Sequence, residues 1–496
     1  LVRYAGNEQN LRSYTDIDLL TATNAPGSEV FGAYSLQVLG SVDLNPIITA
    51  DTRLADLHGG DGVTLGRIEI SDGATSSIVD LAGAETIGDV IDLIEANPPA
   101  GRTITATLSA TGLDIAIDPV PGTALTIREV GGGQTAADLG ILAETSAGDG
   151  PIVGSDLDPR LTLTTPLANI TGLTDLSGLQ ILNAGQTHTI DLTSAVTIED
   201  LLNAINGSEA QALAEINEAG TGLNLRSLLA GTDFAVGENG GLTATQLGLR
   251  SLTEETLLAD LNFGEGVRGH DGDDFLIRRS DGSTFAIDVD GAATLGDVID
   301  LINNHADNQT PGTQITAGLA AFGNGLELVE ANPVVGGSLQ VEEIFGSHAA
   351  RDLGLVPLGA TSRLSDPPTT VGASQVLTGR DVNPLEVSGV FNSLIRLHEA
   401  LLANNLPEIN RAIGLLDLDY EQINFARGEV GFRGQALDAL ATRLADEEVQ
   451  LQSTLSKELD TDMAKAISEL TARQAALEAT LRMTANLHQL TLFSFL

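Results

Sequence analysis

A nine-residue pattern of polar and apolar positions occurs three times along the chain. Threonine is followed three residues later by aspartate, and apolar residues four apart come next, at 86–94, 294–302 and, more loosely, 197–205. The threonine hydroxyl can accept a hydrogen bond from the aspartate amide, while the carboxylate can accept one from the threonine amide and favours the positive end of a helix. Each copy therefore predicts the start of a helix with one apolar face. The predicted helix caps are Thr86, Asp89, Thr197, Asp200, Thr294 and Asp297.

Strand-like segments surround each predicted helix in the same order. An alternating segment comes before the helix, and two more follow it with a turn between them. Each copy closes on Leu-Gly-aliphatic, as in Leu139-Gly140-Ile141, where glycine suits the position just after a helix. A repeat of about a hundred residues is a small domain and not one turn of a solenoid. The pattern therefore predicts three β-α-β-β modules, each with a short closing helix. The predicted strands lie at 78–81, 104–108, 112–115, 189–192, 222–225, 285–289, 315–319 and 325–328.

The C-terminal part shows helical spacing and contains no proline after Pro407. One pattern of leucines covers 437–451, and a second runs from about residue 460 to 492 with apolar residues in alternating steps of four and three. Such spacing predicts a heptad seam with one polar position. A single helix cannot bury its own apolar stripe, so this seam needs a partner: the other helical pattern of this chain, a helix before Leu1, or a neighbouring subunit. The predicted assembly residues are Met463, Ile467, Leu470, Gln474, Leu477 and Leu481.

These patterns predict the α+β class: an array of small β-α-β-β modules carried on a long α-helical, coiled-coil-forming C-terminal region. The opening residues differ, and the segments 2–4 and 11–14 predict a β-hairpin. Because the chain starts at Leu1 and its first residues read as the middle of a domain, we expect it to be N-terminally incomplete. The predicted parts are 1–45 (hairpin piece of an inner domain), 46–155, 156–258 and 259–368 (modules 1 to 3) and 369–496 (helical region).

The charge is strongly acidic and unevenly distributed. The 496 residues carry 68 Asp and Glu against 24 Lys and Arg, and the part from Leu385 onward has only 16 acidic and 9 basic residues. An acidic surface repels nucleic acids and anionic lipids, so we expect no nucleic-acid partner. No apolar run of about 18 residues exists, so we expect no membrane insertion. With 3% aromatic residues and no tryptophan, the chain also lacks material for a ring-lined binding cleft.

The sequence contains no constellation that predicts catalysis. Cysteine is absent, which excludes disulfides, thiolate metal sites and cysteine nucleophiles, and neither a nucleophile elbow nor a P-loop occurs. We expect no enzyme, no catalytic residue, no cofactor and no metal site. The best calcium candidate is 269–274, with Asp271, Asp273 and Asp274 close together. Its spacing fits neither an EF-hand nor a glycine-rich calcium repeat, and clusters like it are expected by chance in so acidic a chain.

The tail resembles the C-terminal region of bacterial flagellins and their junction relatives. The residues that carry this resemblance are Lys-Glu-Leu-Asp-Thr-Asp-Met-Ala at 457–464, Gln-Ala-Ala at 474–476 and the ending at 490–496. Arg427 and the stretch 430–437 match the preceding helix of that family. The three Thr-x-x-Asp modules resemble the flagellin-hook insertion repeat of flagellar axial proteins. The opening, at 3–7 and 27–31, is similar to a stretch of the hook-associated protein 3 family, the second of two hook–filament junction families.

The resemblance implies a structural subunit of the bacterial flagellum at the hook–filament junction, with acidic modules on the outside and no enzymatic activity. Members leave the cell unfolded through the flagellar type III export channel and act outside it. The implied partners are hook-associated protein 1, flagellin, further copies of the chain and an export chaperone. The sequence lacks the N-terminal helices of the family. Alternatives are a filament-cap protein or a flagellin with enlarged outer domains and, more distantly, an acidic repeat adhesin or calcium-binding extracellular protein.

Overall fold

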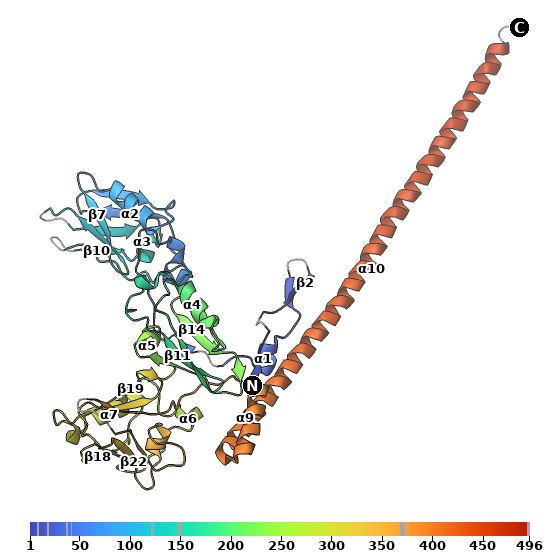
Figure 1. Cartoon of the computed structure of the whole chain (residues 1–496). Helices are drawn as coiled ribbons and strands as arrows, with labels where there is room; N and C mark the ends of the chain where they lie inside the picture. Colours follow the sequence, from blue (N-terminus) through green and yellow to red (C-terminus); the bar gives the residue numbers. More distant parts are fainter. Residues whose placement is uncertain are drawn as a thin grey trace. The chain divides into compact units, whose positions relative to one another are not determined.

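The chain folds into three small modules and one very long helix (Figure 1). The structure, a computed structural model, describes residues 1–496 except 7–8, 17–18, 36–37, 41, 121–123, 146–149, 368–372 and 494–496. Two compact units result: the body, Leu1–Gly6 with Phe31–Asp419, and the arm, Asn7–Val30 with Tyr420–Leu496. Small antiparallel sheets combined with helices confirm the α+β class. Asn7 and 494–496, which contribute to the family resemblance, lie outside the described residues.

Each module has the order strand, strand, helix, hairpin, strand, short helix. The structure therefore contains the predicted β-α-β-β elements and adds one strand before them and one after them. Module 1 consists of β5 (Arg67–Ser71), β6 (Ser76–Asp80), α2 (Ile87–Ala96), β7 (Ile104–Leu108), β8 (Leu113–Ile117), β9 (Thr126–Glu129) and α3 (Thr135–Asp138). Module 2 consists of β11 (Leu179–Asn183), β12 (Gln186–Ile190), α4 (Ile198–Asn206), β13 (Ala212–Ile216), β14 (Leu223–Ser227), β16 (Ala235–Asn239) and α5 (Thr243–Gln246). Module 3 consists of β17 (Phe275–Arg278), β18 (Thr284–Ile287), α7 (Leu295–Asn303), β19 (Ile315–Leu319), β21 (Leu326–Glu330), β22 (Gln340–Glu343) and α8 (Ala349–Asp352).

Every module has its own apolar core. In module 1 the first strand, β5, is central and pairs antiparallel with β6 and β9, while β7 and β8 form a separate hairpin. The apolar face of α2, formed by Ile87, Val90 and Ile94, is completely buried against residues of these strands. Burying such side chains stabilises the module by roughly 1.5–3 kcal/mol each. The equivalent helices α4 and α7 bury the same face in modules 2 and 3.

Module 2 is completed by strands from other parts of the chain. The sheets of modules 1 and 3 end in their own strands, β10 (Ala143–Glu144) and β23 (Ser362–Leu364). The sheet of module 2 ends instead in β20 (Phe322–Gly323), which belongs to module 3, and its hairpin pairs with β4 (Val38–Leu39). The hairpin of module 3 pairs with β24 (Gln375–Thr378). Modules 2 and 3 are therefore joined by main-chain hydrogen bonds as well as by the chain itself.

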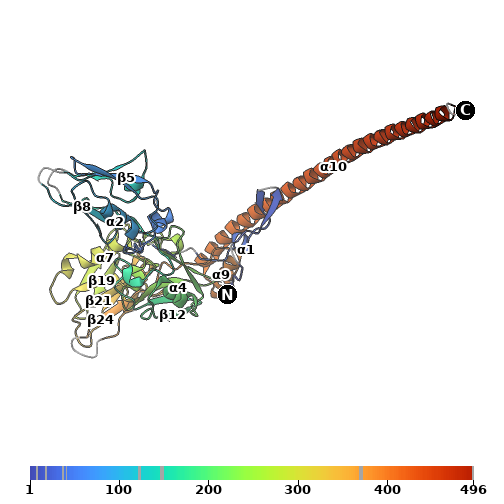
Figure 2. The same cartoon turned by 90° about the horizontal axis from the view of Figure 1, so that it is seen from above.

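The two helical patterns of the tail fall on one continuous helix. After α9 (Val390–Ala403), α10 runs without interruption from Leu406 to Phe493 over 88 residues, as Figures 1 and 2 show. The predicted second helix is therefore part of a longer one, and the pattern at 437–451 does not return as its antiparallel partner. The physical reason is the absence of any glycine or proline after Gly434 that could break the helix.

The opening residues pair differently from the prediction. The predicted hairpin between 2–4 and 11–14 is wrong: β1 (Val2–Arg3) pairs with β15 (Leu229–Ala230) of the body, and β2 (Arg12–Asp16) pairs with β3 (Leu19–Ala22) in the arm. The short β1 pairs with β15, which has no other strand partner among the described residues. β2 instead pairs with β3, the next strand in the sequence. In the arm, the side chain of Arg433 on α10 donates to the backbone carbonyl of Asn24, which follows this hairpin.

Candidate functional site

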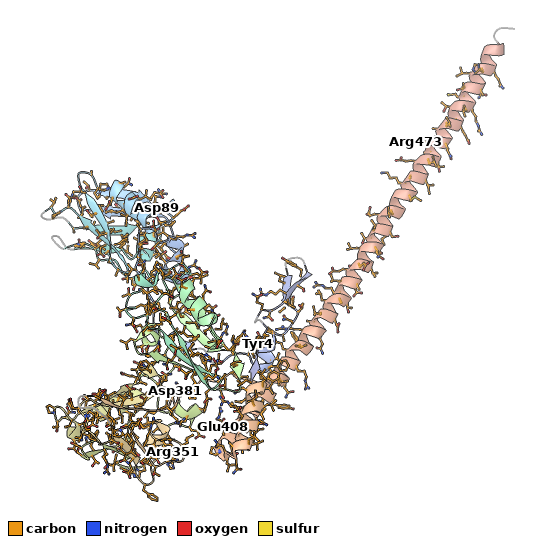
Figure 3. All side chains as sticks on the ribbon, in the orientation of Figure 1. Tyr4, Asp89, Arg351, Asp381, Glu408 and Arg473 are labelled. Atoms are coloured by element: carbon orange, nitrogen blue, oxygen red, sulfur yellow. The ribbon has the colours of Figure 1, made fainter. Side chains whose placement is uncertain are left out.

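The six seam residues of α10 are all exposed. Figure 3 shows side chains that point away from this helix along most of its length. The five apolar seam residues are 58–63% exposed, and Gln474 is exposed as well. Alternating steps of four and three average 3.5 residues, close to the 3.6 of a helical turn, so the six side chains form one continuous stripe. Covering each apolar member would contribute about 1–2 kcal/mol, because more than half of its surface is still in water. The exposed apolar members are Met463, Ile467, Leu470, Leu477 and Leu481.

The apolar stripe continues toward the N-terminal end of α10 with a different period. Leu451, Leu455 and Leu459 are also exposed, and from Leu451 to Ile467 every step is four residues long. At about 100° per residue, a four-residue step turns the stripe forward by roughly 40°, whereas a heptad turns it back by roughly 20°. A partner helix that follows the seam would therefore supercoil in the left-handed sense along 463–481. Along the preceding residues, from 451, it would have to wind in the opposite sense. Leu455 and Leu459 were missed at the sequence level, although their spacing to Leu451 is visible there.

The seam lies in a segment whose charges nearly cancel. Between residues 457 and 489 there are five acidic and four basic side chains, and one of the latter, Arg473, is labelled in Figure 3. The residues before Leu385, in contrast, carry 52 acidic against 15 basic side chains. Helices with balanced charge can pack side by side without strong repulsion, whereas acidic modules repel one another and stay hydrated. The electrostatics therefore favour association through the helix and not through the modules.

The predicted cap residues lie at the N-termini of the three module helices. At α2 the Thr86 hydroxyl accepts from the Asp89 amide at 3.2 Å, and the Asp89 carboxylate accepts from the Thr86 amide at 2.9 Å. Backbone hydrogen bonds of this kind lower the pKa of each cap aspartate below its ordinary value. These residues serve three separate helices, so the structure does not bring them together into one site. The equivalent pairs are Thr197 with Asp200 at α4 and Thr294 with Asp297 at α7.

A second set of helix-capping groups was missed by the sequence analysis. Before each module helix, a Thr-x-x-Thr turn presents two backbone carbonyls to the first amides of the helix. In module 1 the Ile87 amide donates to the carbonyl of Thr52 at 3.0 Å and the Gly88 amide to that of Ala50 at 2.8 Å. The first three amides of α2 are thus all satisfied. The signal was available as a repeated motif, Thr-x-x-Thr-x-Leu-Ala-Asp/Asn, at 49–56, 162–169 and 253–260.

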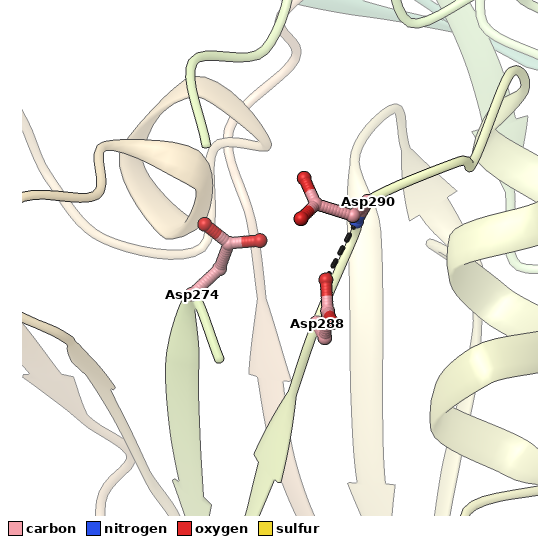
Figure 4. A group of neighbouring side chains, drawn as sticks. All are labelled: Asp274, Asp288 and Asp290. Carbon is pink, nitrogen blue, oxygen red and sulfur yellow. Dashed lines mark hydrogen bonds between the residues drawn. The ribbon is translucent and has the colours of Figure 1, made fainter. Parts of the chain in front are cut away.

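The calcium candidate assembles differently from the prediction. Of Asp271, Asp273 and Asp274, only Asp274 belongs to the group of carboxylates that the structure brings together, and its neighbours are Asp288 and Asp290 (Figure 4). Asp274 is completely buried and accepts hydrogen bonds from the Ser347 hydroxyl at 2.8 Å and from two backbone amides at 2.9 Å. These three hydrogen bonds offset the free-energy cost of burying the carboxylate. Asp274 therefore orders the loops around β17 with protein donors alone. One of its carboxylate oxygens and one each of Asp288 and Asp290 lie within 4.8 Å of one another, a spacing that a metal ion could also use.

No helix in the described part of the chain is long and apolar enough to cross a membrane. Comparison with models of known protein families and with curated proteins finds no match. Among solved structures, the chain is similar to the crystal structure of the flagellar cap protein FliD from Helicobacter pylori. The identity is 14%, 73% of this chain and 98% of that chain are covered, and the TM-score is 0.13. A TM-score this low indicates no common overall fold, so the similarity supports no conclusion about the function of this chain.

Proposed function

We propose that this chain is a non-enzymatic structural subunit of the bacterial flagellum, located at the hook–filament junction. The observation that carries the proposal is the exposed seam on α10, whose apolar residues are more than half exposed. A helix in a protein gains most of its stability from packing of its apolar face against other elements, and this face has heptad spacing. The proposal therefore assigns the seam to contacts with other helices in a polymer.

The resemblance of the tail to flagellins suggests which polymer this is. Segments 457–464 and 474–476, which resemble that family, overlap the seam itself. The proposed partners are hook-associated protein 1, flagellin and further copies of the chain, and an export chaperone would bind it before export. Export through the flagellar type III channel requires an unfolded chain, and the absence of cysteine suits such a passage because no disulfide can form on the way.

The acidic modules take the outer position in this proposal. Their cores are closed and their surfaces carry most of the negative charge. The modules are therefore stable in water, and contact between modules of different copies is unfavourable. The segment 457–489 of α10, which is nearly neutral, is the part that copies can share. This division assigns assembly to α10 and leaves the modules as hydrated additions on the surface.

The proposal can be tested with full-length chain and hook–basal bodies that carry hook-associated protein 1 from the same organism. Electron microscopy should show the chain bound at the distal end of the hook and able to accept flagellin there. The variants Leu470→Asp and Leu477→Asp should lose this binding, because each places a charge in the apolar seam. Matched controls are Ala472→Asp and Ala479→Asp, which introduce the same charge two residues away, on the opposite face of the helix.

The possible results separate the junction from its rivals. Binding that survives in Leu470→Asp and Leu477→Asp would contradict the role of the seam. Binding only at the tip of a finished filament would favour a cap protein over a junction subunit. Calcium-dependent binding to surfaces without any flagellar component would favour the adhesin, and all three results would count against the proposal.

A further inference from the structure

A left-handed turn occurs at the same place in the opening loop of each module. Ten residues after the first threonine of each Thr-x-x-Thr turn stand Gly59, Gly172 and Phe263, with φ of 65°, 84° and 61°. Glycine adopts this conformation freely, whereas a residue with a Cβ atom loses about 1–2 kcal/mol in it. Module 3 therefore carries phenylalanine where both other modules carry glycine, and it does so at a cost in backbone energy.

The turn around Phe263 is held by hydrogen bonds to module 3 and to the segment that follows it. The preceding residue, Asn262, is also left-handed, with φ of 55°. Its backbone amide donates to the carbonyl of Val382 at 2.7 Å, and its side-chain amide donates to the carbonyl of Asp352 at 2.9 Å. Asparagine tolerates this conformation better than most residues. These hydrogen bonds fix the backbone of the turn, and with it the direction in which the Phe263 side chain points away from module 3.

The Phe263 ring lies against two arginines of the helices that follow the modules. The guanidinium carbon of Arg411 on α10 is 4.1 Å from the ring centroid, and that of Arg396 on α9 is 6.0 Å from it. Both arginine side chains are largely buried. A cation over an aromatic ring contributes about 0.5–2 kcal/mol, and the larger values apply when water is excluded. Because Phe263 itself is still 39% exposed, the contact offsets part of the cost of the strained turn.

Carboxylates hold both arginines in position beneath the ring. Glu386 bridges them, at 2.6 Å from a terminal guanidinium nitrogen of Arg411 and 3.0 Å from Nε of Arg396. Arg396 also pairs with Asp233 of module 2 at 2.6 Å. Burial alone would raise the pKa of Glu386, but the hydrogen bond and charge of Arg411 and the charge of Arg396 outweigh it and keep the pKa below its ordinary value. Glu386 is thus a charged bridge between α9 and α10.

We propose that Phe263 is a latch that fixes module 3 on the base of α9 and α10. The base comprises α9 and the first turns of α10, up to Asp419, all within the body. The ring replaces a glycine in only one of three equivalent turns, and that turn is the one in contact with Arg396 and Arg411. Release of the latch would free the base to reorient relative to module 3 without unfolding either part. This inference does not depend on the flagellar proposal.

The test uses the full chain with two introduced labels. Because the chain has no cysteine, Thr310→Cys in module 3 and Glu399→Cys in α9 give one defined pair of spin labels, and both positions are exposed. The distance distribution between the labels should be narrow in the parent chain and broad in Phe263→Gly. Amide exchange within α9 and within module 3 should stay unchanged, because neither part unfolds. Since glycine relieves the strained turn, the melting temperature of module 3 should not fall.

Two further variants make the outcome decisive. Phe263→Leu keeps the side-chain bulk but removes the ring, and it should broaden the distance distribution as well. The control Phe345→Gly removes an aromatic ring of module 3 that is fully exposed, and it should change nothing. An unchanged distribution in both Phe263 variants would overturn the proposal. Equal broadening in the Phe345 control, or a lower melting temperature of module 3 in Phe263→Gly, would overturn it too.

Discussion

The module helices and the long helix α10 both place apolar residues four positions apart, but these residues are buried in the modules and exposed on α10. In α7, Val298 and Ile302 are four residues apart and completely buried, whereas in α10 Met463 and Ile467 have the same spacing and are about 60% exposed. The module helices have about ten residues, capped starts and sheets that cover them; α10 has 88 residues and a seam that nothing in the described chain covers. The spacing of apolar residues therefore identifies the apolar face of a helix, but the segments that surround the helix determine whether that face is covered.

The largest expected effect is the destabilisation of one module, with α10 beyond Asp419 left intact. Phe275 of module 3 is completely buried, and Phe275→Ala should destabilise that module by about 3–5 kcal/mol through the cavity it leaves. Module 2 should lose stability as well, because β20 of module 3 completes its sheet. Amide exchange followed by mass spectrometry can resolve each part. Loss of protection in α10 beyond Asp419 along with module 3 would show that the two regions are not independent.

A smaller effect is expected at the helix caps. Thr294→Ala removes the hydroxyl that accepts from the Asp297 amide, and it should cost about 1 kcal/mol of module 3 stability. Thr294→Ser keeps the hydroxyl and serves as the matched control. Thermal melting of the two variants gives the difference. Equal stability of both would mean that the Thr-x-x-Thr turn alone satisfies the start of α7, and that the cap pair adds nothing.

Acid should weaken module 1 but not the seam. Backbone amides of Thr75 and Ala74, together with Arg102, lower the pKa of Asp72 to about 2, against the partial opposition of its burial. A lowered pKa stabilises the fold above the ordinary value of 3.8, and this contribution is lost as the pH falls from about 4 toward 2. Asp72→Asn should flatten this part of the pH profile of module 1 melting. The seam contains no titratable side chain, so a similar acid dependence of its contacts would contradict the comparison.

The smallest effect is expected in the seam of the free chain. Leu470→Ala should change the unfolding free energy of the unassembled protein by less than about 0.5 kcal/mol, because the side chain is 58% exposed there. In an assembled form the same change should weaken association by about 2 kcal/mol or more. Chemical denaturation of the free chain and sedimentation of the assembly give the two values. A large loss in the free chain would mean that the seam is already covered.

The sequence predicted those features that depend on neighbouring residues. The capping threonines and aspartates lie three residues apart, and the seam follows from spacing within a single helix. The predicted boundary at 258/259 falls within the opening loop of module 3, whose repeated motif had been overlooked, and the core of that module begins at Leu252. Contacts between distant segments could not be predicted. The pairing of β20 with β16 joins residues 83 to 85 positions apart, and the contact of Phe263 with Arg411 joins residues 148 positions apart. No local pattern indicates either.

Hydrogen exchange of residues 463–481, measured in the free and in the assembled protein, shows whether the seam becomes covered only on assembly. We expect fast amide exchange there in the free chain, beside slow exchange in α2, α4 and α7, and strong protection of the same residues once the chain is bound at the hook–filament junction. Slow exchange of 463–481 in a free monomer, unchanged by any flagellar component, would contradict this expectation.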